Sequence, residues 1–101
     1  MWTPRQSRDG YTANRAVTFP NRSRSYDVTR RVVRFWGYDR SMETSFFVSA
    51  DALKRIQPNL QLDEAGLLHA FDINRDLIYA AAAKVYASGR KGSYELDVAN
   101  F

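Results

Sequence analysis

The stretch RRVVRFWGYDRSMETSFFVS, residues 30–49, decides the fold because it contains two alternating apolar runs with a turn between them. Successive side chains of a strand point to opposite faces of a sheet. A strand over Val28–Trp36 therefore places Val33 and Phe35 on one face. A return strand over Met42–Ser49 carries a matching apolar face. The stretch predicts a β-hairpin with one strongly apolar side.

Working outward from the hairpin, turn-forming residues mark its borders. Within the hairpin, GYDRS (residues 37–41) is typical of a turn. Upstream, Asn21–Asp27 is polar and predicts a loop. AVTF (Ala16–Phe19) alternates and is stopped by Pro20, which predicts a short strand at a sheet edge.

After the hairpin the apolar period changes from two to about 3.6, which indicates helices. Ser49 is the expected N-cap of a short helix over Ala50–Gln57, which Pro58 ends. Asp63 is the expected N-cap of a second, longer helix that runs to about Ser88, with Gly89 as its left-handed stop. Its core-facing stripe consists of Leu67, Phe71, Ile78, Ala82 and Val85.

The final segment SYELDV (Ser93–Val98) predicts a last strand, with Tyr94, Leu96 and Val98 facing inward. The order β-β-β-α-α-β predicts an α+β two-layer sandwich, in which two helices cover one face of an antiparallel four-stranded sheet. The last strand can pair beside the first strand or beside the third. Residues 16–101 form one predicted domain, and residues 1–15 an Arg-rich flexible tail.

Composition excludes several chemistries. The 101-residue chain has no cysteine, so disulfides, thiolate metal sites and a cysteine nucleophile are excluded. Its first residues lack the apolar run of a signal peptide. LIYAAAA (residues 77–83) is the longest apolar run and is too short to cross a bilayer. We therefore expect a cytoplasmic protein that does not enter membranes.

Charge is unevenly distributed along the chain. Residues 1–40 contain nine arginines against three aspartates, a local charge of +6. Residues 41–101 contain six Lys and Arg against eight acids, a local charge of −2. Such asymmetry suggests a polyanion or an acidic surface on a second copy as partner, although a basic, soluble tail explains it equally well.

Several of these segments resemble a small bacterial family catalogued as domain of unknown function 1488. They are FPNRSRSYD (19–27), VRFWG (33–37), SFFV (45–48), DEAGLLHAFDINRDLI (63–78), AAAAKVY (80–86) and GSYEL (92–96). The resemblance covers roughly residues 16–101. It implies an antiparallel sheet with helices on one face, and it brings no established activity or catalytic residue.

The residues do not assemble into a recognisable catalytic or metal site. His69 is the single histidine, and the helix angle places it opposite Phe71, towards solvent. A zinc site needs three or four ligands, and a general base needs a partner within reach. No glycine-rich phosphate loop is present. We therefore expect no cofactor, no metal and no enzymatic activity.

Asn74 and Arg75 flank the apolar stripe of the long helix. A buried guanidinium needs a carboxylate or a carbonyl as partner. The favoured interpretation is a structural anchor that ties helix to sheet or loop. The alternative is an anion-binding arginine at the rim of a pocket. The loop FPNRSRSYD (Phe19–Asp27), with Tyr26 and Asp27, is a candidate partner.

The predicted outer sheet face carries Arg34, Trp36 and Phe47, with Arg30 at one end. Exposed apolar clusters often mark contact sites, and Trp and Arg are typical interface anchors. We expect this chain to be a protein-interaction module, most simply a homodimer formed through this face. Nucleic-acid binding by the Arg-rich N-terminal region is the second hypothesis. An unrecognised hydrolase is the third hypothesis. A monomer whose tail or loop covers the cluster is the alternative in which this face has no partner.

Overall fold

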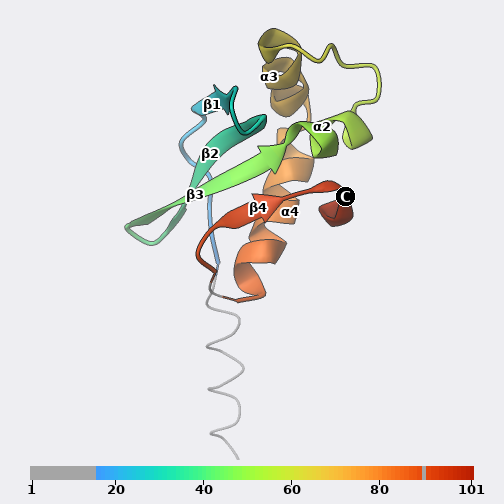
Figure 1. Ribbon diagram of the computed structural model, residues 1–101. Coiled ribbons are helices and arrows are strands. Elements are labelled where there is room, and N and C mark those ends of the chain that lie inside the picture. The colour runs from blue at the N-terminus through green and yellow to red at the C-terminus, as the bar shows by residue number, and fades with distance from the viewer. Residues whose placement is uncertain (1–15, 90) are drawn as a thin grey trace, which may run out of the picture.

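The computed structural model describes residues 16–89 and 91–101, so the predicted tail, residues 1–15, lies outside the described residues. Four strands form one sheet in the order β1-β2-β3-β4 (Figure 1). Their bounds are β1 Arg24–Asp27, β2 Val32–Asp39, β3 Met42–Ser49 and β4 Tyr94–Leu96.

Three α-helices pack on one face of this sheet, and α4 crosses behind β3 and β4 in Figure 1. They are α2 Ala50–Ile56, α3 Glu64–Ile73 and α4 Arg75–Ala87, and a 3₁₀ turn, η1 (Val98–Asn100), follows β4. The predicted α+β fold with a four-stranded sheet is confirmed, whereas the predicted number of two helices is wrong.

The central hairpin forms as the alternation predicted. Phe35 of β2 lies opposite Phe46 of β3, and both side chains are fully buried. The hairpin turn is shorter than expected, because Asp39 still pairs with Met42 and only Arg40 and Ser41 connect the strands. Arg40 takes the positive φ of 61° that the turn requires. The two-residue connection is typical of tight hairpins.

Gly37 lies inside β2 and not in the turn. A Cβ atom there would lie 2.6 Å from Val17 Cγ2 and 2.8 Å from Phe19 Cε1. Because glycine has no Cβ, it leaves the space in which Val17 and Phe19 pack onto the sheet. The prediction that the turn begins at Gly37 was wrong, because this glycine serves a close approach of side chains.

The strand and the loop predicted before the hairpin are exchanged in the structure. Ala16–Phe19 is not a strand and makes a single bridge, in which Thr18 pairs with Tyr38. The edge strand is β1, inside the segment predicted to be a polar loop. Residues 28–31 form the turn into β2, so β2 starts at Val32 rather than Val28. An edge strand tolerates polar side chains because one of its sides faces solvent.

Asn74 splits the predicted long helix into α3 and α4. Its side-chain amide donates to the Ala70 carbonyl at 2.8 Å, and its backbone N–H turns to the Phe71 carbonyl at 3.2 Å. An Asn side chain that bonds the local backbone competes with the helical pattern. The predicted caps are confirmed at the other helix starts: Ser49 accepts from Ala52 N, and Asp63 accepts from Gly66 N.

β4 pairs with β3 in parallel, so the sheet is mixed and the predicted all-antiparallel sheet is wrong. The two successive helices α3 and α4 carry the chain back along the sheet in one pass, as Figure 1 shows. The chain therefore re-enters the sheet at the end where β3 begins. Tyr94 and Leu96 face the core as predicted, but Val98 is exposed because the chain has already left the sheet.

Aromatic rings fill the space between the layers. Phe35 lies 5.4 Å from Phe46 and 5.1 Å from Phe71, measured between ring centroids. Phe19 stacks on Tyr79 of α4 at 4.3 Å, which fixes the N-terminal segment to the helical layer. Such contacts add to the free energy of burying the rings.

Candidate functional site

Two groups of arginines form the candidate sites. The first is on the open face of the sheet, the face opposite α2, α3 and α4. Arg34 is exposed there, while Trp36 and Phe47 are half-buried. Their sequence neighbours Phe35 and Phe46 are fully buried on the other face. The predicted division of inner and outer residues in the hairpin is therefore observed.

Guanidinium groups cover the rings of the open face. Arg34 Cζ lies 5.2 Å from the Trp36 ring centroid and 5.8 Å from that of Phe47. Arg34 also donates to Ser45 Oγ at 2.9 Å. Arg30 Cζ lies 4.5 Å from the Phe47 centroid, within the range of a cation–π contact. The four candidate residues of this face are thus brought together as one cluster.

Acidic groups border the same cluster. Arg30 forms an ion pair with Glu95 of β4 at 3.5 Å, with both side chains about half exposed. Glu43 accepts a hydrogen bond of 2.7 Å from the Tyr38 hydroxyl, and this bond is the main reason why the pKa of Tyr38 is raised. The face is therefore of mixed charge and not uniformly basic.

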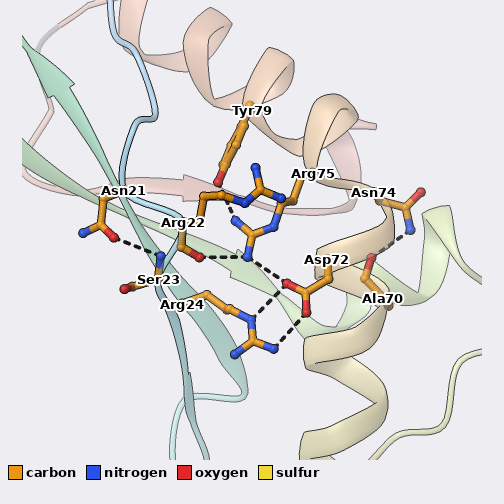
Figure 2. A network of polar contacts seen from close by, with 9 residues as sticks. All are labelled: Asn21, Arg22, Ser23, Arg24, Ala70, Asp72, Asn74, Arg75 and Tyr79. Atoms are coloured by element: carbon orange, nitrogen blue, oxygen red, sulfur yellow. Dashed lines mark hydrogen bonds and ion pairs between the residues drawn. The ribbon is translucent and has the colours of Figure 1, made fainter.

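The second group is a network around Asp72, which connects β1 with α3 and α4 (Figure 2). Arg24 Nε and Nη2 donate to the two carboxylate oxygens at 2.9 and 2.8 Å. Arg75 Nη2 donates to Asp72 Oδ1 and to the Arg22 carbonyl, both at 2.8 Å. Arg75 Nη1 donates to the Tyr79 hydroxyl at 2.6 Å. The network connects the edge strand to both helices.

Local structure explains how these groups meet. Arg24 lies opposite the buried Phe35, so its side chain leaves β1 on the helix face. Asp72 and Arg75 lie three residues apart across the helix break, a spacing at which side chains face each other. The hydrogen bond from Arg24 is the largest cause of the lowered pKa of Asp72, and the bond from Arg75 adds to it. The same carboxylate raises the pKa of Arg24.

Arg75 is buried, with 8% of its surface exposed, and it has the carboxylate and carbonyl partners that its burial demanded. The Phe19–Asp27 segment supplies one partner, the Arg22 carbonyl, but Tyr26 and Asp27 themselves form no hydrogen bond with Arg75 among the described residues. Tyr26 packs against the core, and Asp27 accepts from the backbone of Thr29 and Arg30 in the turn. Asn74 bonds to Ala70 and Gln57 instead of joining the network.

Sequence reasoning missed Arg24 and Asp72. The Asp72–Arg75 spacing was visible and could have nominated the carboxylate. Arg24 was hidden because its strand was taken for a loop, and loop residues have no assigned face. His69 is exposed, as the helix angle predicted.

Residues 16–89 and 91–101 contain neither a candidate metal site nor a candidate membrane span. No group of three or more His, Cys, Asp or Glu side chains is arranged to hold a metal ion there. No helix in that part of the chain has the length and apolar character needed to cross a membrane.

The chain therefore has an α+β fold, in which a mixed four-stranded sheet carries its helices on one face and the two arginine groups lie on opposite sides of the sheet. This chain belongs to the family described as "Protein of unknown function (DUF1488)", whose model matches residues 17–96. The resemblance noted in the sequence is thereby confirmed.

A solved structure gives the same fold. It is the crystal structure of a protein of unknown function from the DUF1488 family, from Shewanella loihica PV-4. The TM-score is 0.71 at 15% sequence identity, and the match covers 81% of this chain and 92% of that chain. No curated protein matches this chain. At this identity the similarity supports the fold alone.

Proposed function

We propose that this chain is a non-catalytic interaction module that forms a homodimer through the open face of its sheet. One observation carries the proposal: Trp36 and Phe47 lie on the face opposite the helices, with Arg34 beside both rings. Aromatic residues and arginine are the residue types most enriched among interface anchors.

The mixed charge of the face favours a second copy as the partner. A twofold interface brings the same patch of both subunits together, so the patch must complement itself. Arg30 and Arg34 lie on this face with Glu43 and Glu95, so an arginine of one copy can meet an acid of the other. Such pairing also sets the register of association.

The same features argue against a nucleic-acid platform here. Bases stack on free ring faces, whereas guanidinium groups already lie over Phe47 and Trp36. The acids of the face also repel phosphate. The excess of arginine over residues 1–40 remains the basis of the nucleic-acid hypothesis, and a gel shift at low salt tests it separately.

Sedimentation equilibrium of wild type and Trp36→Ala tests the proposal. We expect a wild-type dimer, weakened in Trp36→Ala by about 2 kcal/mol, the size of an interface hot spot. Leu62→Ala is the matched control, because Leu62 is an exposed apolar residue of the loop before α3. It should leave the dimer unchanged. A wild-type protein that stays monomeric at high concentration would eliminate the proposal.

A further inference from the structure

Next to the Asp72 network the surface is hollowed by a cavity of about 530 Å³. It is lined by Arg22, Ser23, Arg24, Asp72 and Arg75. This volume lies within the range of small-molecule sites. The cavity lies between β1 and the helices, apart from the open face, and self-association as proposed above does not use it.

The lining carries more positive than negative charge. Three guanidinium groups contribute +3 and the Asp72 carboxylate contributes −1, which leaves a net charge of +2. Asp72 is itself fully engaged, because both of its oxygens accept from arginines. Asp72 therefore balances only one of the three arginines, and the remaining positive charge favours an anion as ligand.

Donors remain free at this cavity. Arg24 uses Nε and Nη2 for Asp72, and no group among residues 16–89 and 91–101 accepts from its Nη1. In the same part of the chain no acceptor contacts the Arg22 guanidinium, although the Arg22 carbonyl is bound by Arg75. Arg22 therefore has a fixed backbone and an unused side chain at the cavity rim.

Arg24, the loop backbone that carries Arg22, and the supporting Arg75 are also held in place before any ligand arrives. Bidentate bonding to Asp72 orients Arg24, and three short hydrogen bonds orient Arg75. The Asn21 side chain accepts from Ser23 N at 2.9 Å and so shapes the loop that carries Arg22 (Figure 2). Groups that are already ordered lose little freedom on binding, which favours affinity.

We propose that this cavity binds a tetrahedral phosphate dianion, either free phosphate or a phosphate monoester, at the part of its lining formed by Arg22, Ser23 and Arg24. Planar guanidinium groups donate in forks that match phosphate oxygens. A dianion neutralises the net charge of +2, which a single carboxylate ligand does not. Asp72 and Arg75 act as positioning residues that hold Arg24 and the loop.

The test is a titration of the ¹⁵N-labelled chain with inorganic phosphate and, separately, with phenyl phosphate, at constant ionic strength. We expect saturable shifts of the Ser23 and Arg24 amides and of the Arg24 side-chain Nε–H. Tighter binding of inorganic phosphate identifies free phosphate, and tighter binding of phenyl phosphate identifies a monoester. Both results support the site.

Arg22→Gln is the decisive variant, because it removes the guanidinium and keeps the carbonyl that binds Arg75. Phosphate binding should weaken at least tenfold, the loss expected for a charge-assisted contact. Arg40→Gln, the same change at the β2–β3 turn, should leave binding unchanged.

Three results would overturn the proposal. One is the absence of saturable shifts, and another is equal phosphate affinity in wild type and Arg22→Gln. The third is binding of a single-stranded oligonucleotide without binding of either small phosphate, which would indicate nucleic-acid recognition instead. None of these results depends on whether the chain dimerises.

Discussion

The open sheet face and the Asp72 network use the same residue type in opposite ways. Arg75 is buried and makes three hydrogen bonds of 2.6 to 2.8 Å. Arg34 is exposed, stacks beside aromatic rings and donates to one serine hydroxyl. Burial makes the loss of a partner costly, whereas solvent replaces a partner on the surface. The contrast in burial indicates that the network stabilises the fold, whereas the exposed arginines of the open face remain available for the contact with a second copy proposed above.

The largest expected effect compares two adjacent phenylalanines on opposite faces of β3. Phe46→Ala removes a fully buried ring and should lower the free energy of unfolding by about 3–5 kcal/mol. Phe47→Ala removes a half-buried ring and should cost about 1 kcal/mol. Urea denaturation of dilute protein measures both. Equal losses would contradict the assignment of the faces.

Asp72→Asn should have the next largest effect. It removes the charge that Arg24 and Arg75 share and leaves Arg75 buried without a counter-ion, at a cost of about 2 kcal/mol. Asp76→Asn is the matched control in the next helical turn, where the acid is exposed, and should cost about 0.5 kcal/mol or less. If both variants unfold at the same urea concentration, the network does not stabilise the fold.

Because the pKa of Asp72 is lowered in the folded chain, the stability difference between wild type and Asp72→Asn depends on pH. The pKa of Asp72 in the folded chain is below the value of about 3.9 expected when unfolded. The stabilisation is therefore complete above that value and is lost as the pH falls through the folded pKa. The stability gap between wild type and Asp72→Asn should be constant from pH 7 to about pH 5 and should shrink towards pH 3. A gap that grew on acidification would contradict the sign.

The smallest expected effect is at the open face. A double-mutant cycle of Arg30→Ala and Glu95→Ala should give a coupling energy of about 0.5 kcal/mol or less, which disappears in high salt. The pair is 3.5 Å apart with both side chains about half exposed. The equivalent cycle for Arg24 and Asp72 should give a larger coupling, since its two bonds are short and bidentate. Thermal denaturation at two salt concentrations measures both cycles.

Much of the hairpin could be predicted because its pattern is strong. Period-two alternation placed Phe35 and Phe46 correctly on one face and Trp36 and Phe47 on the other. The caps at Ser49 and Asp63 were equally readable, since a side-chain oxygen before a helix satisfies its first N–H groups. The edge strand β1 was not predicted, because an edge strand tolerates a polar sequence that resembles a loop.

The two candidate sites also differ in how much of each could be predicted from the sequence. The open-face cluster needed only the alternation of one hairpin and was nominated in full. The network needed three segments to meet, namely the loop at Arg22, the strand at Arg24 and the helix break at Asp72 to Arg75. The sequence showed that Arg75 required an oxygen partner but did not show which one.

By itself the sequence determined the central hairpin with its inward and outward faces, the helix starts at Ser49 and Asp63, and the family to which the chain belongs. Only the tertiary structure decided the parallel pairing of β4, the edge strand and the carboxylate that holds Arg24 and Arg75. Local patterns set which side of an element is apolar, because burial depends on side chains a few residues apart. Which distant segments meet depends on the path of the whole chain, here a single helical pass that returns it beside β3.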